Sequence, residues 1–177
     1  PAVRALGYNA LDSAGNVLQR MNYLGPTIVT KEGMPVNVEL VNNLAKAGTT
    51  MFPKFGMQLV PPAVATANNV VMHRHGGLQK PGDDGNPTDT FPPGTSRTNY
   101  YPNNQAAAPL WYHDHTDMVT SYNVYAGLAG YLPNTDRREP SFNLPTGDFA
   151  KAYFLQDKSF NKDHSLCYTH VSPEFYG

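Results

Sequence analysis

Two short stretches decide how this chain folds: VVMHRHGG at residues 70–77 and LWYHDH at residues 110–115. Each begins with apolar, strand-favouring residues and runs into a His-x-His pair, a pattern typical of a short strand that ends at a polar site. Six histidines placed at random in 177 residues would form about 0.2 such pairs, so the two pairs indicate a functional site rather than coincidence.

The spacing within the pairs predicts that four imidazoles share one surface. Residues i and i+2 of a strand point to the same face, with Cα atoms about 7 Å apart. His73 and His75 therefore share a face, as do His113 and His115, while Asp114 points the other way and is expected to be a hydrogen-bonding or ion-pairing group rather than a ligand. Neutral imidazole binds Zn, Cu, Fe or Ni, and copper(II) most tightly of the divalent ions. Two neighbouring strands with these pairs predict a site for more than one metal ion.

The composition indicates a folded domain rich in turns. The 177 residues are 40% hydrophobic and 15% charged, with 15 Gly and 16 Pro. This length favours one domain, and the surplus of Gly and Pro favours many short strands. A net charge of −1 without long runs of one sign argues against nucleic acid or an anionic membrane surface as a partner. The compartment stays open, with a weak preference for a secreted, extracellular location.

The remaining pattern predicts an all-β sandwich or barrel with long loops. Residues 36–41 alternate in polarity as a half-buried strand does, and residues 31–33 before them read as a hairpin turn. Further elements are expected as follows: strands at 70–72, 110–112, 125–132 and 149–155, a helical turn at 116–122, loops at 44–69 and 79–109, and an irregular tail after 160.

The residues around the histidine pairs resemble the motifs of multicopper oxidases. VMHRHGG (71–77) resembles the first histidine motif of that family, and LWYHDH (110–115) resembles the second. NVYAGLAG (123–130) follows as in the spore-coat laccase and bilirubin oxidase branch. GPTI (25–28) is similar to the opening strand, and FLQDKSF (154–160) looks like a later strand of the same domain. On this resemblance the chain is identified as the N-terminal domain of a laccase-type oxidase.

The resemblance implies both a fold and a cofactor. The fold is a cupredoxin-like Greek-key β-barrel at residues 1–160, followed by an irregular tail at 161–177 that leads toward a missing next domain. The cofactor is a trinuclear copper cluster that lies between the first and last domains and reduces dioxygen to water. Its type 2 and type 3 coppers would be shared with a partner.

The same resemblance assigns roles to five residues. Carried over by position, His73 would bind the type 2 copper. His75 and His113 would share one type 3 copper, and His115 would bind the other. Asp84 matches an acid near the water channel of the spore-coat branch, and it would help to deliver protons.

Half of such an active site has no counterpart in these residues. A blue copper site needs a cysteine thiolate and two histidines, but Cys167 is flanked by Leu166 and Tyr168. The expected partner is a second polypeptide or cleaved fragment with the remaining histidine motifs and the blue copper site. The assembly would oxidise phenolic, aminophenolic or bilin-like small molecules. The chain would then be a subunit or a cleavage product, in preference to a truncated fragment, and alone it should not be a laccase.

Other classes of protein fit the pattern less well. A non-catalytic copper-binding or assembly subunit would keep the four histidines without electron input. HDHTD (113–117) begins like the motif of metallo-β-lactamase-like zinc hydrolases, but Met118 stands where a histidine is needed. A cupin needs a Glu shortly after the first pair, and residues 76–88 contain none. His164 and His170 are expected to be solvated surface residues.

Overall fold

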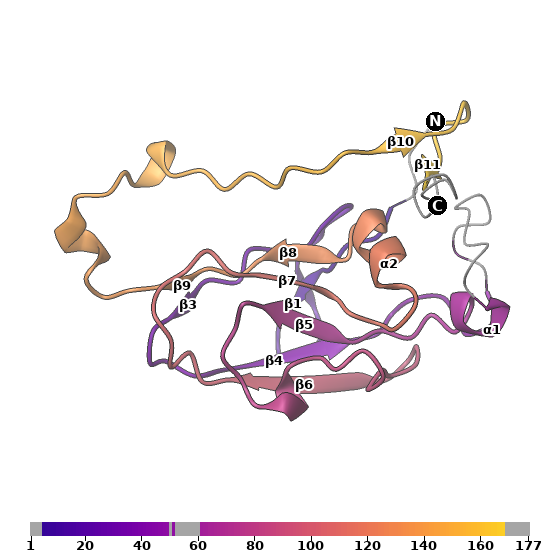
Figure 1. The fold of residues 1–177 in the computed structure, drawn as a ribbon, viewed down its shortest axis with the longest axis horizontal. Helices are drawn as coiled ribbons and strands as arrows, with labels where there is room; N and C mark the ends of the chain where they lie inside the picture. The colour runs from indigo at the N-terminus through magenta and orange to yellow at the C-terminus, as the bar shows by residue number, and fades with distance from the viewer. Residues whose placement is uncertain (1–4, 50, 52–60, 169–177) are drawn as a thin grey trace, which may run out of the picture.

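The computed structural model describes residues 5–49, 51 and 61–168, and it consists mainly of short strands (Figure 1). The elements are β1 (Ala10–Leu11), β2 (Val17–Gln19), β3 (Thr30–Lys31), β4 (Val36–Val41), α1 (Pro62–Ala65), β5 (Met72–His75), η1 (Pro81–Asp83), β6 (Ser96–Tyr101), β7 (Trp111–Asp114), α2 (Thr120–Ala126), β8 (Ala129–Tyr131), β9 (Asn134–Thr135), η2 (Glu139–Phe142), η3 (Gly147–Phe149), β10 (Ser159–Phe160) and β11 (Leu166–Cys167). The predicted all-β class is confirmed. Among the described residues no helix has the length and apolar character that crossing a membrane requires.

Two sheets form the body of the domain. β7 lies between β5 and β8 in a three-stranded antiparallel sheet, and β4 pairs with β6 in a second antiparallel sheet. Figure 1 shows the second sheet along one side of the first. The described strands form five small sheets altogether and no closed barrel, so the packing within the described residues is that of a sandwich.

The apolar core fills the space between these two sheets. Met72 of β5 and Tyr112 of β7 pack with Tyr101 of β6 and with Leu132, and all of them are buried. Removal of this apolar surface from water is the main stabilising contribution, and it fixes β5 and β7 side by side. Val38 joins from β4, whose inward and outward residues alternate as predicted.

Two segments that the sequence predicted to be loops contain regular elements. β6 lies inside the predicted loop 79–109, because alternate residues of this polar strand, Asn99 and Tyr101, are buried against the core. The predicted loop 44–69, of which residues 50 and 52–60 lie outside the described part, contains the single turn α1.

The helix after β7 begins later than predicted. Thr116 does not cap it, since its N–H and hydroxyl both donate to the carboxylate of Asp114. The backbone of Met118 has a φ of 62°, outside the helical region, so α2 begins only at Thr120. α2 also occupies the start of the segment 125–132, and this leaves β8 as a strand of three residues.

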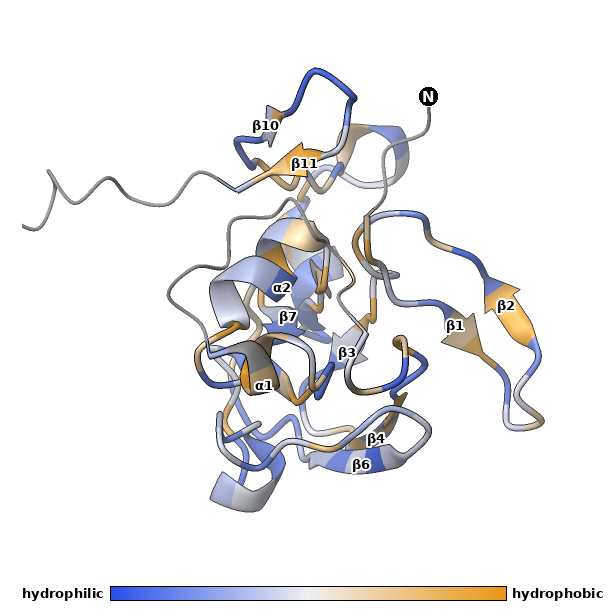
Figure 2. Cartoon of the chain, turned by 90° about the vertical axis from the view of Figure 1, so that its right-hand side faces the viewer, coloured by the Kyte–Doolittle hydropathy of each residue, from blue (hydrophilic) through white to orange (hydrophobic). Residues whose placement is uncertain are grey.

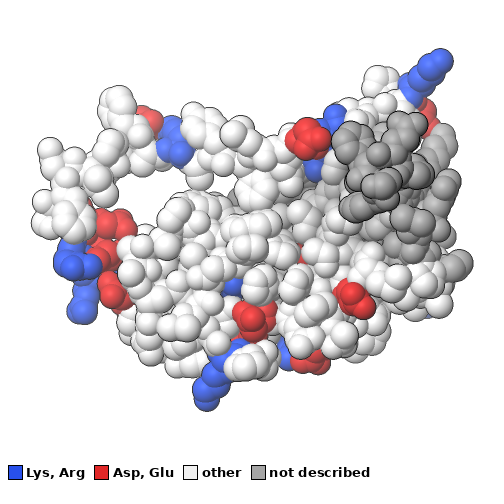
Figure 3. Space-filling view, in the orientation of Figure 1, with Lys and Arg blue, Asp and Glu red and all other residues white. Residues whose placement is uncertain are grey.

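The predicted strand at 149–155 is wrong for this structure. Residues 150–158 have no sheet partner among the described residues and run along one side of the body (Figure 1). Figure 3 shows open space between part of this segment and the body. The exposed fractions of Phe149, Tyr153 and Leu155 are 87%, 81% and 91%, so a strand-favouring sequence has no second sheet to pack on here.

Two hairpins lie outside the body of the domain. β1 and β2 form a small hairpin that projects to one side in Figure 2. β10 pairs with β11 in another, so the predicted irregular tail after residue 160 contains a strand. The apolar residue Leu166 of β11 is buried against Tyr122 and Ala126 of α2, and this contact explains why the tail is ordered there.

Candidate metal centre

The register of β5 and β7 brings the two His-x-His pairs together. His73 lies directly opposite His113 in the antiparallel ladder, and His75 lies opposite Trp111. His115 follows the last residue of β7, and its backbone N–H donates to the carbonyl of Val71 at 2.9 Å. The expectation that the pairs lie on neighbouring strands is therefore confirmed.

The four imidazoles gather on one face of this sheet. The ring centroid of His73 lies 5.5 Å from that of His75, 5.4 Å from that of His113 and 4.9 Å from that of His115. Potential ligand nitrogens of His73, His75 and His113 lie within 4.8 Å of one another. His115 is not in this tighter group, although its ring stacks on that of His73.

Backbone carbonyls orient three of the rings. In each case Nδ1 faces a carbonyl oxygen: His73 faces Asp84, His113 faces Asp114 at 2.7 Å, and His115 faces Gly85 at 2.8 Å. A carbonyl can only accept a hydrogen bond, so Nδ1 carries the proton in the neutral ring. Nε2 of the same ring then has its lone pair free for a metal ion, which is the usual arrangement of a ligating histidine.

The loop that supplies two of these carbonyls depends on Gly85. A Cβ atom there would lie 2.3 Å from the carbonyl oxygen of Met72 and 2.8 Å from the Cα of His73. Its φ of 75° also lies in the region that favours glycine. Only glycine lets the loop lie flat against β5 and reach His73 and His115. Asp-Gly is a turn signal in the sequence, but nothing in the spacing revealed this contact with the histidines.

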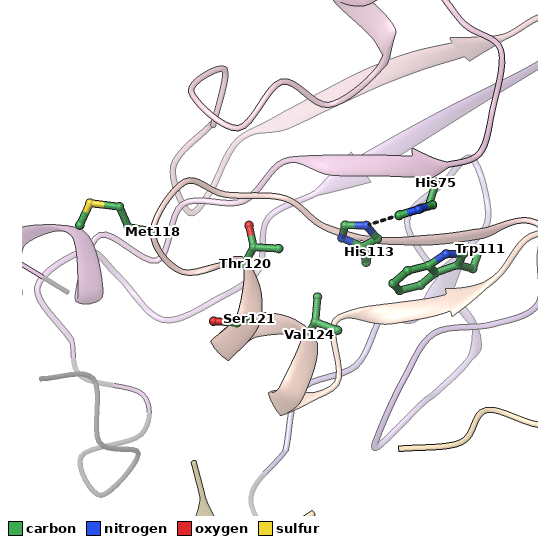
Figure 4. A pocket seen from close by; sticks show the side chains of 7 residues that line it. All are labelled: His75, Trp111, His113, Met118, Thr120, Ser121 and Val124. Carbon is green, nitrogen blue, oxygen red and sulfur yellow. Dashed lines mark hydrogen bonds between the residues drawn. The ribbon is translucent and has the colours of Figure 1, made fainter. Parts of the chain in front are cut away.

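His75 and His113 each bring one ring nitrogen close to the other ring. Nδ1 of His75 lies 3.3 Å from Nε2 of His113 (Figure 4). Two nitrogens that each lie about 2.0 Å from one ion can have this separation at a nearly tetrahedral angle. Burial, with a smaller effect of the other histidines, lowers the pKa of His113 to about 4. The ring is therefore neutral at physiological pH, as a metal ligand must be.

An open groove gives access to this pair from outside the domain. Its volume is 490 Å³, and its walls are formed by His75, Trp111, His113, Met118, Thr120, Ser121 and Val124. Figure 4 shows His75, His113 and Trp111 toward one end, with side chains of α2 along the other part. The Trp111 ring stacks on His75, with centroids 5.0 Å apart, and lies 4.4 Å from the ring of His113. Trp111 therefore supports both rings from the side.

Asp84 lies beside His73, on the Nδ1 side of the ring. Its Oδ1 is 3.3 Å from that nitrogen, and it also contacts Nε2 of Gln79. The carboxylate is 48% exposed, so it contacts both the solvent and a histidine of the cluster. Its predicted part in proton delivery stays a prediction.

Asp114 is a hydrogen-bonding group, as its position in the strand predicted. It is fully buried on the opposite face from the imidazoles. Its carboxylate accepts hydrogen bonds from Asn123, from Thr116 and from the backbone of Val71. Burial raises the pKa of Asp114, whereas these hydrogen bonds act in the opposite direction. The sequence carried no signal for the part of Asn123 in this network.

Of the remaining histidines and the cysteine, those that the structure describes lie apart from the cluster. His164 is exposed in the turn between β10 and β11, as predicted. His170 lies outside the described residues. Cys167 is a free, half-buried thiol in β11, in a hairpin apart from the sheet that carries the imidazoles.

The donor set fits copper. Four imidazoles gather here, the most buried of them is neutral at physiological pH, and three have their Nδ1 atoms engaged by carbonyls. Imidazole suits copper, zinc, iron and nickel, with the highest affinity for copper(II). The geometry therefore defines an all-β domain with a histidine-rich site for copper or a related transition metal.

Comparison with known proteins identifies the family. A family model described as multicopper oxidase matches residues 64–138, which include all four histidines. Laccase from Bacillus subtilis is 34% identical over 182 residues, which cover 95% of this chain and 32% of the laccase. Bilirubin oxidase from Albifimbria verrucaria is 33% identical over 147 residues, which cover 82% of this chain and 22% of that enzyme.

The solved structures agree with this result. A crystal structure of a multi-copper oxidase from Pediococcus acidilactici superposes with a TM-score of 0.65 and 27% identity, covering 93% of this chain and 28% of that one. The chain belongs to the multicopper oxidase family, and it spans about a third or less of the length of these relatives.

Proposed function

We propose that this chain is the domain of a laccase-like oxidase that supplies half of the ligands of a trinuclear copper centre. The observation that carries the proposal is the convergence of four imidazoles from adjacent strands, three of them oriented by backbone carbonyls. His73 would bind a type 2 copper, His75 and His113 one type 3 copper, and His115 the other. The short contact between His75 and His113 supports their sharing one ion.

Each group of the site then has a separate task. Bound copper would supply the one-electron chemistry that couples oxidation of a phenolic, aminophenolic or bilin-like substrate to reduction of dioxygen to water. The carbonyls of Asp84 and Gly85 hold the Nδ1 protons of His73 and His115 and so aim the Nε2 atoms. Reduction of dioxygen also consumes protons, and the half-exposed carboxylate of Asp84 would carry them inward from solvent.

The other half of the site would come from beyond these 177 residues. In the relatives named above, the matching segment is part of one longer chain, so the missing ligands and the blue copper site would lie on the same polypeptide or on a second one. The groove beside His75 and His113 leaves these rings accessible to such a partner segment. We further propose that residues 1–160 form the first domain and that 161–177 lead toward the next, with the β10–β11 hairpin spanning this division.

Copper binding by the chain tests the site directly. We expect His113→Asn to weaken copper(II) binding at least about 100-fold, beyond the cost that loss of an outer-shell partner usually has. Competition with a chelator of known affinity measures the change. His164→Asn is the matched control, because His164 is exposed and its φ of 66° is one that asparagine tolerates. Equal affinities for the two variants would overturn the proposed site.

Experiments on the assembled protein distinguish the proposed oxidase from the alternative function, a copper-binding or assembly subunit without turnover. Native mass spectrometry would count the coppers and detect a second polypeptide. Oxygen uptake with a phenolic substrate should appear only when the blue copper site is present, and the chain alone should lack an intense blue absorption band. A complete, copper-loaded assembly without oxygen uptake would support the assembly subunit.

A further inference from the structure

Asp114 occupies an unusual place for a charged side chain. It lies between His113 and His115 in the sequence, at the end of β7, and its exposed fraction is 0%. Its side chain points into the layer behind the imidazoles, so it is not placed to bind a metal ion there. A buried carboxylate is costly unless hydrogen bonds replace its hydration.

Four hydrogen bonds satisfy this carboxylate, two at each oxygen. Oδ1 accepts from the N–H of Val71 at 3.1 Å and from the hydroxyl of Thr116 at 2.9 Å. Oδ2 accepts from the N–H of Thr116 at 3.2 Å and from the amide of Asn123 at 2.9 Å. Every partner is a donor, so a carboxylate accepts all four bonds, which a neutral amide cannot.

These donors come from three separate segments. Val71 directly precedes β5, Thr116 lies in the turn after β7, and Asn123 lies on the buried side of α2. One side chain therefore ties together the start of the first histidine strand, the end of the second and the helix that lines the groove.

The position of His115 depends most on this connection. The regular ladder between β5 and β7 ends at the pair Met72 and Asp114, so His115 lies beyond it. Its backbone is held by one hydrogen bond to the carbonyl of Val71, whose own N–H is bonded to Asp114. On the other side of His115, Thr116 is folded back onto the same carboxylate.

We propose that Asp114 is a positioning residue whose carboxylate holds His115 in register with His73 and His113, and so sets the distance of His115 from the other imidazoles. The inference deepens the proposed copper function and rests on it for its consequence, but the positioning itself is a property of the metal-free chain. Removal of an outer-shell partner typically costs about 10–100-fold in metal affinity.

The test uses Asp114→Asn, which keeps the size of the side chain but leaves a backbone N–H, that of Val71 or that of Thr116, facing an NH₂ group. The first readout is the tautomer of each imidazole in the metal-free chain, followed by ¹⁵N NMR. We expect the Nδ1–H form of His115 to be lost or averaged in the variant, while His73 keeps it. An unchanged tautomer and an unchanged chemical shift of His115 in folded Asp114→Asn would overturn the proposal.

The second readout is copper(II) affinity together with the electron paramagnetic resonance spectrum. We expect about 10–100-fold weaker binding and an altered spectrum. The matched control is Asn134→Asp, an equally small change at a buried residue whose side-chain bonds go to Thr30, Gln105 and Ala106 rather than to β5 or β7. The control should lower stability without changing the histidine tautomers or the copper spectrum.

A milder variant covers the case in which Asp114→Asn does not fold. Asn123→Ala removes one of the four donors, and it should shift the His115 resonances and weaken copper binding by up to about tenfold. If every variant that folds binds copper as tightly as the wild type does, the positioning role is refuted and the copper function is left intact. A wild-type chain that binds no copper, while the variants still lose the His115 tautomer, would refute the copper function and leave the positioning role intact.

Discussion

Asp114 and Arg74 stand at the same place in the two histidine pairs and are stabilised very differently. Each lies between the two histidines of a pair, each points away from the imidazoles, and each has an exposed fraction of 0%. Asp114 accepts four hydrogen bonds. Arg74 donates from Nη1 to Asn103 at 2.6 Å and lies over the ring of Tyr101 at 5.2 Å.

The guanidinium of Arg74 is only partly satisfied. Among the described residues, its Nε and Nη2 atoms have no hydrogen-bond partner. Burial correspondingly lowers the pKa of Arg74. The comparison teaches that alternation in a strand places a residue on a face but does not say whether its charge will be satisfied there. That depends on segments which are distant in the sequence.

Removal of the Asp114 carboxylate should have the largest effect on stability. Asp114→Ala leaves the backbone N–H groups of Val71 and Thr116 and the side-chain amide of Asn123 without this acceptor. We expect the free energy of unfolding to fall by about 4 kcal/mol and the Tm by roughly 10 °C. Chemical and thermal denaturation of the metal-free chain measure the change. A loss below about 1 kcal/mol would remove the contrast with Arg74.

Replacement of Arg74 by an apolar residue should have a much smaller effect. Arg74→Met keeps the packing of a long side chain, loses one hydrogen bond, and removes a buried charge with two unpaired nitrogens. We expect the free energy of unfolding to be unchanged or raised by about 1 kcal/mol. The same denaturation experiment checks this. A decrease as large as that of Asp114→Ala would show that Arg74 is stabilised as fully as Asp114.

Removal of an exposed charge should have the smallest effect on stability, and it serves as the reference for the two substitutions above. Lys151 pairs with Asp148 at 3.2 Å in a segment where the Asp148 side chain is 97% exposed. Water and salt screen such a pair, so Lys151→Ala should change the Tm by less than about 1 °C. A shift of several degrees would mean that this exposed ion pair contributes far more to stability than its exposure to solvent predicts.

The site was more predictable from the sequence than the strands around it. The period of two predicted that the histidines of each His-x-His pair share a face, and the pairing of β5 with β7 then brought the two pairs together. β6 was missed because its burial comes from contacts with the core rather than from its own polar sequence. The strand predicted at 149–155 was wrong for the opposite reason, since its residues favour a strand but have no sheet to join.

The sequence alone determined the all-β class, the four histidines, the face shared within each pair and the turn of Asp114 away from the imidazoles, because these follow from local spacing and composition. Only the tertiary structure decided which groups those residues meet: His113 opposite His73, the carbonyls of Asp84 and Gly85 beneath two rings, and Asn123 beside Asp114. The physical reason is that hydrogen bonds and burial depend on distances between segments, and the folded core sets those distances.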